Sequence, residues 1–185
     1  MRLNPLKCAF GVTTGKFLGF MLTSRGIEAN PEKCEAITQM RSPSSVKEVQ
    51  QLTGRIAALS RFLSKSAYKS LPLFQLLKKG KDFKWTGECE AAFQELKVYL
   101  SQPPILSKPQ EGETLFLYLS VNDEAVSAAL VRELEEGQKP VYFVSKVLQE
   151  AEKRYQKIEK LAFALVTTSR RLRQYFQCHP MVVRT

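Results

Sequence analysis

The hydrophobic pattern changes its period in the middle of the chain, and this change limits the possible folds more than any other feature of the sequence. From Val46 to Leu63 apolar residues recur every three or four positions, which is the spacing of an amphipathic helix. After residues 103–112 the pattern turns to short apolar runs, which indicate strands. The proline-rich stretch "SQPPILSKPQEGE" between the two patterns therefore predicts a boundary between a helical unit and a unit built on a β-sheet.

Turn and capping signals divide each half of the chain into elements. Short apolar runs between residues 7 and 28 predict β structure, and Asn30-Pro31 predicts the start of a helix over 31–40. Further helices are expected at 44–63, at 66–79 with an interruption at Leu71-Pro72, and after Thr86. After the boundary we expect strands at 114–120, 125–133 and 139–146, one unbroken helix from Leu148 to Phe176, and a last strand in "MVVRT". The predicted order is β, then α, then βββαβ.

The composition is typical of a globular protein with a polyanionic partner. Of the 185 residues 44% are hydrophobic, and 28 Lys and Arg against 18 Asp and Glu give a formal charge of +10. This excess favours nucleic acid first and a membrane surface second. Four dispersed cysteines and a single histidine, His179, predict reduced thiols in an intracellular protein and no metal site. Because the sequence shows no membrane-spanning run and no signal peptide, we expect a soluble chain without a membrane partner.

One segment is basic without any acidic residue. Residues 55–81 contain no Asp or Glu, and their basic residues are Arg55, Arg61, Lys65, Lys69, Lys78, Lys79 and Lys81. Such a run can be a solvated helix face. Because like charges repel each other, a bound polyanion explains it better, and we predict contacts with nucleic-acid phosphates.

A narrow stripe of mostly small residues lies on the second predicted helix. Gln50, Gly54 and Ala58 are spaced by four positions, so they share one face. Glycine in a helix interior costs about 1 kcal/mol relative to alanine, which is tolerated where another backbone must approach closely. Either a packed neighbouring helix or a nucleic-acid groove fits this requirement, and the spacing alone does not separate them.

The stretch "LFLYLSVNDEAVSAAL" raises the question of a catalytic site. Strand, strand, strand, helix and strand is the opening order of the RNase H-like fold, whose metal site takes Asp from the first strand, Glu from the first helix and Asp from the fourth strand. Two divalent ions beside a phosphate require such converging carboxylates. Here the first strand ends in Ser120, a carboxylate follows only at Asp123, and the helix offers Glu159.

Five motifs in the same order resemble the pol polyprotein of gypsy-type LTR retrotransposons. They are "LNPLKCAF", "KFLGFMLTSRGIEANPEKCEAI", "VKEVQQLTGRIAALSRF", "FKWTGECEAAFQELKVYLSQPPIL" and "PVYFVSKVLQEAEKRYQKIEKLAFALV". The resemblance covers nearly the whole chain. It implies the end of a reverse transcriptase palm, a thumb, and an RNase H-like or connection domain.

The resemblance also implies roles for particular residues. Phe17, Leu18, Gly19 and Phe20 match the primer-grip hairpin. Gln50, Gly54 and Ala58 match the thumb face that follows the minor groove of the primer–template duplex. Glu159 matches the helix glutamate of the RNase H site.

The departures from the family pattern concern catalysis. The Tyr-x-Asp-Asp turn of the polymerase site is absent, and the family expectation places it upstream of this segment. The first RNase H aspartate falls at Ser120, and the next is expected after Thr185. "LYLSVND" is thus interpreted as the remains of an active site, in which Glu159 and Asp123 are vestigial candidates.

Together these features predict an α+β chain in three pieces. They are the end of a palm with the primer-grip hairpin at 1–30, a helical thumb at 31–105, and an incomplete, connection-type RNase H-like βββαβ unit at 106–185. The expected function is non-catalytic: gripping and positioning an RNA–DNA or DNA duplex beside the rest of the pol polyprotein. Two alternatives stay open, namely an active RNase H that uses Asp123, and a domesticated or truncated fragment that serves only as an interaction module. No cofactor is expected in this chain, whereas the resemblance implies Mg²⁺ for the parent enzyme.

Overall fold

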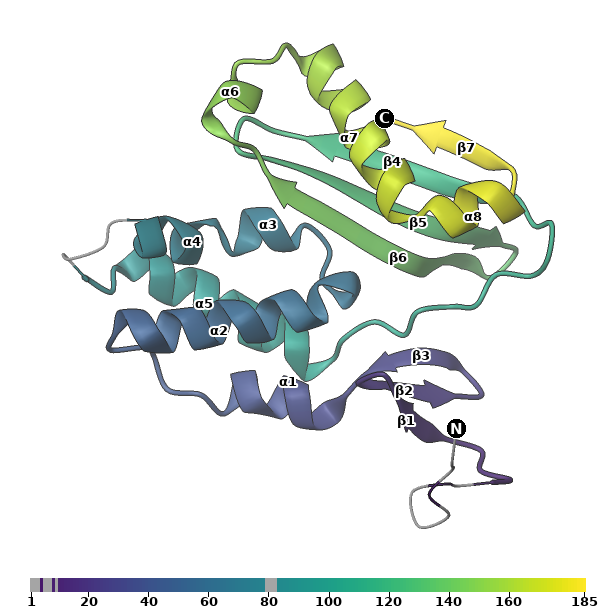
Figure 1. Ribbon diagram of the computed structural model, residues 1–185, viewed down its shortest axis with the longest axis horizontal. Coiled ribbons are helices and arrows are strands. Elements are labelled where there is room, and N and C mark those ends of the chain that lie inside the picture. Colours follow the sequence, from purple (N-terminus) through teal and green to yellow (C-terminus); the bar gives the residue numbers. More distant parts are fainter. Residues whose placement is uncertain (1–3, 5–7, 9, 79–82) are drawn as a thin grey trace.

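The computed structural model describes residues 4, 8, 10–78 and 83–185 of the chain. Three parts follow one another in the sequence (Figure 1): a small sheet of β1 to β3, a helical unit of α1 to α5, and a C-terminal unit of β4 to β7 with α6 to α8. The predicted α+β class and the order β, α, βββαβ are confirmed.

The small sheet is a meander of three short antiparallel strands. They are β1 (Gly15–Phe17), β2 (Phe20–Thr23) and β3 (Gly26–Ala29). The turn between β1 and β2 places Leu18 and Gly19 in the left-handed region, with φ of 49° and 80°, as tight hairpin turns require. At the outer edge of β3, Ile27 and Leu106 exchange two backbone hydrogen bonds of 2.8 Å each. The proline-rich stretch is thereby attached to this sheet.

Side-chain caps begin three of the helices at the expected positions. Asn30 accepts a hydrogen bond from the N–H of Glu32, Ser45 from that of Glu48, and Thr86 from that of Cys89. The helices of this unit are α1 (Pro31–Thr38), α2 (Val46–Leu59), α3 (Ser66–Lys69), α4 (Leu71–Lys78) and α5 (Gly87–Ser101), with the 3₁₀ turn η2 (Ser60–Phe62) after α2. One core joins them, and its largest fully buried side chains include Phe62 and Phe93.

The C-terminal unit is a four-stranded sheet in the order β6-β5-β4-β7. Its strands are β4 (Leu115–Val121), β5 (Ala125–Leu134), β6 (Gly137–Val147) and β7 (Met181–Arg184). Neighbouring strands are antiparallel except β4 and β7, which are parallel. The crossover between β6 and β7 is helical, as parallel pairing of this kind requires.

The expectation of one unbroken helix from Leu148 to Phe176 is wrong. The structure has three helices, α6 (Glu150–Lys153), α7 (Lys157–Arg171) and α8 (Arg173–Cys178). Gln156 and Glu159 form a capping box, so the chain starts a new helix there although the apolar period continues. At the other end Leu172 leaves the helical region, with φ of −108° and ψ of 28°.

The two faces of the C-terminal sheet are covered by different parts of the chain. Leu117 and Leu119 of β4 pack in a second core with Ala164 of α7. The opposite face meets the helical unit, because Phe143 of β6 packs against the first core and Ser145 Oγ accepts a hydrogen bond of 3.1 Å from the N–H of Ala67. Figure 1 shows α7 and α8 on one side of the sheet and α3 beside β6.

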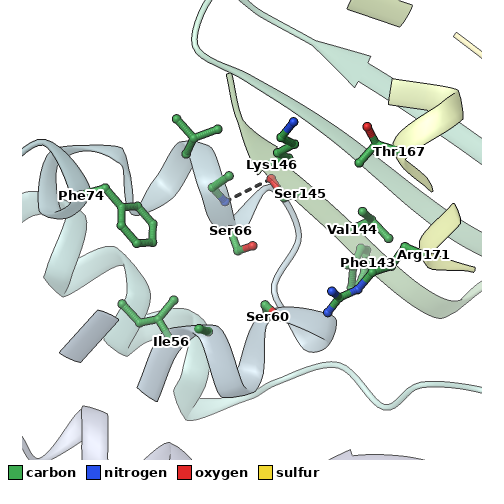
Figure 2. A pocket seen from close by; sticks show the side chains of 13 residues that line it. Ile56, Ser60, Ser66, Phe74, Phe143, Val144, Ser145, Lys146, Thr167 and Arg171 are labelled. Atoms are coloured by element: carbon green, nitrogen blue, oxygen red, sulfur yellow. Dashed lines mark hydrogen bonds between the residues drawn. The ribbon is translucent and has the colours of Figure 1, made fainter. Parts of the chain in front are cut away.

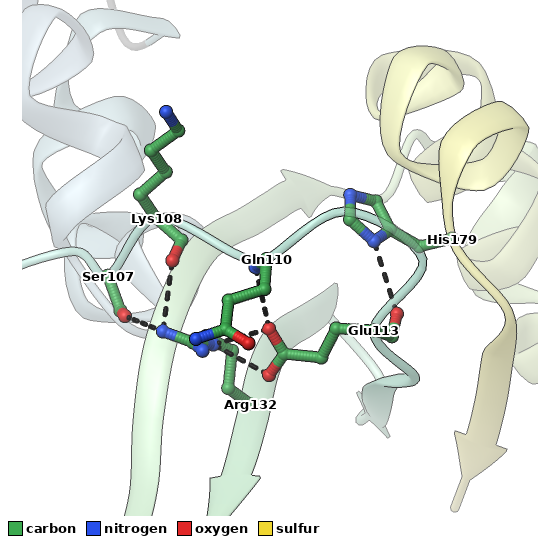
Figure 3. A network of polar contacts seen from close by, with 6 residues as sticks. All are labelled: Ser107, Lys108, Gln110, Glu113, Arg132 and His179. Carbon is green, nitrogen blue, oxygen red and sulfur yellow. Dashed lines mark hydrogen bonds and ion pairs between the residues drawn. The ribbon is translucent and has the colours of Figure 1, made fainter.

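The proline-rich stretch is fixed in place by a polar network (Figure 3). Arg132 Nε donates to both carboxylate oxygens of Glu113, at 2.7 and 2.8 Å. Its Nη1 donates to Ser107 Oγ and to the carbonyl of Lys108, both at 2.9 Å. His179 Nδ1 lies 3.1 Å from the carbonyl oxygen of Glu113. These contacts attach the connection to β5 and to the end of α8.

Burial acts to raise the pKa of the Glu113 carboxyl, but hydrogen bonds from Arg132 and from the N–H of Gln110, with the charge of Arg132, outweigh it. The pKa of Glu113 is therefore held below its ordinary value. Since the pKa of Glu113 is lower in the folded than in the unfolded state, the ionised carboxylate stabilises the fold at pH values above its ordinary pKa. This stabilisation is lost as the pH falls through the lowered value.

Among the described residues, no helix combines the length and the apolar character that crossing a membrane requires.

Replacing Glu113 with Gln is expected to lower the free energy of unfolding at pH 7 by about 1–3 kcal/mol, because it leaves the buried charge of Arg132 without its carboxylate partner. The free energy of unfolding should also fall less steeply for this variant than for the wild type between about pH 5 and pH 3. Urea unfolding at several pH values measures both effects. Glu136→Gln, which removes an exposed partner of Lys139, is the matched control. Equal pH profiles for wild type and Glu113→Gln would contradict the expectation.

Candidate nucleic-acid interface

The stripe on α2 lies on the surface. Gln50, Gly54 and Ala58 are all exposed, while Val49, Leu52 and Ile56 carry the buried face of the same helix. A Cβ placed on Gly54 would meet no atom within 4 Å. The stripe is thus not a contact with a neighbouring helix in the described part of this chain, and its small residues leave space for an approaching partner.

The four predicted primer-grip residues divide into an exposed tip and an anchor. Phe17 and Leu18 are 59% and 80% exposed at the tip of the β1–β2 hairpin. Phe20 instead turns inward, with its ring 5.8 Å from that of Phe62. Gly19 lies against Lys33, whose ammonium a Cβ at this position would displace. The hairpin therefore presents an apolar tip and is held to the helical unit by its second strand.

Arg61 lies at the meeting point of all three parts. Its guanidinium carbon lies 4.7 Å from the ring centroid of Phe20 and 4.6 Å from that of Tyr142. Its Nε is buried and has no hydrogen-bond partner among the described residues. These contacts assign Arg61 a role in joining the hairpin, the helical unit and β6, and the predicted contact with nucleic acid remains untested.

Two further cations of the basic run also have internal partners. Arg55 donates a hydrogen bond of 2.6 Å to the carbonyl of Ala36, which connects α2 to α1. Lys69 forms an ion pair of 3.0 Å with Glu95 of α5. The expected lack of an acidic counterweight to the run is wrong, because α5 supplies Glu95 from a distant part of the sequence.

Of the remaining predicted cations, Lys65 is the one whose side chain the structure describes. Lys65 is exposed before α3 with a left-handed φ of 54°. Lys78 is the last residue of α4, and Lys79 and Lys81 lie outside the described residues. Nucleic-acid binding by these lysines stays a prediction.

The vestigial catalytic candidates have other partners. Glu159 is exposed, and its Oε2 accepts a hydrogen bond of 2.7 Å from the N–H of Gln156 in the capping box that starts α7. Asp123 accepts a hydrogen bond of 3.1 Å from the buried Lys160. The ammonium of Lys160 therefore already pairs with Asp123, the carboxylate that would have to bind a metal ion in the RNase H alternative.

Ser120 lies on the other face of the sheet. Leu119 packs in the core with α7, so its neighbour in β4 points away from that helix. A cavity of about 120 Å³ lies on this side, and Ser120 and Lys65 are both among its lining residues. The serine and Glu159 therefore do not converge, and a neutral hydroxyl, a capping carboxylate and an ion-paired aspartate do not fit the ligand set of Mg²⁺. Within residues 10–78 and 83–185, no three His, Cys, Asp or Glu side chains form a group that could hold a metal ion.

A second basic segment, at the end of α7 and the start of α8, was not identified in the sequence analysis. No Asp or Glu occurs from Lys160 to Thr185. Within that segment Arg170, Arg171 and Arg173 are exposed at the end of α7 and the start of α8. The same count of charges that singled out residues 55–81 could have found them.

Comparisons with known proteins assign this architecture to a class. The model of the RNase H-like domain found in reverse transcriptase matches residues 85–183. The chain therefore belongs to this family of RNase H-like domains. The matched range begins before the predicted boundary at 105/106 and includes α5, and the domain limits stay a prediction.

The relatives are transposon proteins. The chain is 27% identical to the Tf2-3 and Tf2-4 transposon polyproteins of Schizosaccharomyces pombe, over 95% of its own length and 13% of theirs. It spans only about an eighth of the curated relatives that it matches. This similarity confirms the resemblance to a retrotransposon pol polyprotein.

Solved structures share the fold. The foamy viral protease-reverse transcriptase in complex with an RNA/DNA hybrid is 22% identical, with a TM-score of 0.79 over 92% of this chain and 23% of that one. The same viral protein in complex with double-stranded DNA gives 22% identity and a TM-score of 0.77 over 93% and 36% of the two chains.

The structural role of Arg61 predicts an asymmetry between two substitutions. Arg61→Met should lower the free energy of unfolding by about 1–2 kcal/mol, because two cation–π contacts are lost. Arg61→Lys should restore little of it, since an ammonium lacks the planar surface that stacks on rings. Thermal unfolding measures both. A phosphate contact would behave differently, because lysine would then preserve duplex binding and neither variant would lose stability.

The separated candidate residues predict the absence of RNA cleavage. The wild-type chain and the Ser120→Asp variant are both expected to leave the RNA strand of a labelled RNA–DNA hybrid intact with Mg²⁺ or Mn²⁺, because the carboxylates do not converge. Gel analysis of the labelled strand is the measurement. Cleavage by the wild type that disappears on Asp123→Asn would instead establish the RNase H alternative.

Proposed function

We propose that this chain grips and positions a primer–template duplex as a non-catalytic part of a retroelement reverse transcriptase. The partner is an RNA–DNA or DNA duplex, and the rest of the pol polyprotein supplies the chemistry. The exposed stripe on α2 carries the proposal, because it combines small residues with open space above Gly54.

A helix can follow a groove only where its side chains are short enough to let the two backbones approach. Gly54 and Ala58 offer that approach, and Gln50 adds an amide that can donate and accept hydrogen bonds. Glycine at position 54 makes the helix less stable than alanine would, by about 0.5–1 kcal/mol. A partner that needs the space left by the absent side chain accounts for this cost.

The hairpin tip is held at a fixed place relative to the stripe. Phe20 packs on Phe62 of η2, and η2 follows α2 without a gap. Phe17 and Leu18 therefore extend from a rigid base, as a surface that positions one end of a strand requires.

The similar viral protein supports a duplex as the partner. Its structures are described as complexes with an RNA/DNA hybrid and with double-stranded DNA, and this chain shares their fold. The formal charge of +10 favours the same class of partner.

The proposal that the chain is non-catalytic rests on the contacts that Glu159 and Asp123 already make within the chain. Glu159 caps its own helix and Asp123 is paired with Lys160. Mg²⁺ belongs to the parent enzyme in this proposal, and no step in this chain depends on it.

Gly54 separates binding from stability. Gly54→Leu is expected to weaken binding of an RNA–DNA hybrid by at least about tenfold, because the longer side chain fills the space above the helix. Its free energy of unfolding should stay unchanged or rise, since leucine is the better helix former. Fluorescence anisotropy with a labelled hybrid and urea unfolding measure the two quantities.

Ala91→Leu is the matched control, because it places the same leucine side chain at an exposed position of α5. It should leave duplex affinity unchanged. If Gly54→Leu binds as tightly as wild type, or if the wild type shows no duplex binding, the proposal is wrong.

A further inference from the structure

The end of the chain carries positive charge that its own structure does not neutralise. Of the basic residues after Glu159, Lys160 is paired with Asp123, and Arg184 is paired with Glu133 at 3.0 Å. Arg170, Arg171 and Arg173 are exposed, and within the described part of the chain their side chains form no hydrogen bond or ion pair. We call these three residues the arginine cluster.

Helix electrostatics explain only part of this cluster. Arg170 and Arg171 stand in the last turn of α7, where a cation is favourable by about 0.3–1 kcal/mol. Arg173 is the first residue of α8, where a cation opposes the helix dipole. Three guanidinium groups within four positions also repel one another. Binding of an external anion accounts for the part of this positive charge that the helix dipoles do not stabilise.

A cavity lies between the helical unit and Arg171, which is the member of the arginine cluster that lines it (Figure 2). It has a volume of about 440 Å³ and lies between α2, α3 and β6, with α7 at its rim. Arg171 and Thr167 line it on the α7 side, and Ser60 and Ala57 on the other. Figure 2 shows the guanidinium of Arg171 directed from α7 toward the helical unit. Ala57 is exposed and lies three positions after Gly54, so it is a neighbour of the stripe on the surface of α2.

We propose that the phosphate backbone of one duplex strand passes from the α2 stripe across this cavity to the arginine cluster. The inference rests on the proposed function and adds to it a second contact site, located in the RNase H-like unit. Guanidinium groups suit this role, because their fork of N–H donors matches the oxygens of a phosphate. The hydroxyl groups of Ser60 and Thr167 line the path between the two surfaces.

The test is the salt dependence of duplex binding by the full chain. The triple variant Arg170→Gln, Arg171→Gln, Arg173→Gln should bind a labelled RNA–DNA hybrid about 10- to 100-fold more weakly at 0.1 M salt. Each phosphate contact contributes roughly 0.9 to the slope of log affinity against log salt. The slope of the triple variant should therefore be shallower by about 2 to 3. Because the three side chains are exposed and unpaired, thermal unfolding should change little.

The control is a second triple variant with the same change in charge. Lys84→Gln, Lys108→Gln and Arg154→Gln remove three exposed cations that do not line the cavity. Equal slopes for the two triple variants would overturn the proposal, because the loss would then reflect net charge alone.

Gly54→Leu, assayed in parallel, separates this inference from the proposed function. If Gly54→Leu weakens binding and the arginine variant matches its control, the α2 contact stands and the second site is wrong. If the wild type binds no duplex, both are wrong. A slope that flattens only in the arginine variant supports the second site.

Discussion

The contact of Arg61 with two aromatic rings fixes how the three parts of the molecule are arranged. One guanidinium lies against Phe20 of the hairpin and Tyr142 of β6, and it is supplied by η2 at the end of α2. The hairpin tip, the α2 stripe and the C-terminal sheet therefore share one rigid frame. The Nε of this half-buried guanidinium is buried without a hydrogen-bond partner among the described residues, and this is costly unless the rings offset the cost, so the joint depends on all three residues.

The same frame explains why the proline-rich connection is not a free linker. Leu106 is fully buried in the first core and bridges to Ile27, while Ser107 and Lys108 are bound by Arg132 of β5. The helical unit covers one face of the C-terminal sheet, and α7 covers the other. The helical unit thus covers the β6 side of the face that α7 leaves open, which ties the RNase H-like unit to the helices that precede it.

Local signals in the sequence predicted most of the fold, whereas contacts between distant segments were not predictable. Asn30, Ser45 and Thr86 cap their helices as expected, because capping depends on residues within one turn. The break at Gln156 was missed, since the apolar period continues through it. For the candidate site, the exposure of Gly54 could not follow from spacing, and Glu95 lies too far along the chain from Lys69 for a charge count to pair them.

The pair formed by Lys160 and Asp123 has an evolutionary consequence. The buried ammonium of Lys160 in α7 neutralises the carboxylate of Asp123, which follows the end of β4. In the same helix, Glu159 is used to cap the helix start. An aspartate introduced at Ser120 would lie on the far face of the strand, with Lys160 still in place. Removing Asp123 first would leave a buried ammonium unpaired. Neither substitution alone therefore builds a cation site, and each first step costs stability or gains nothing.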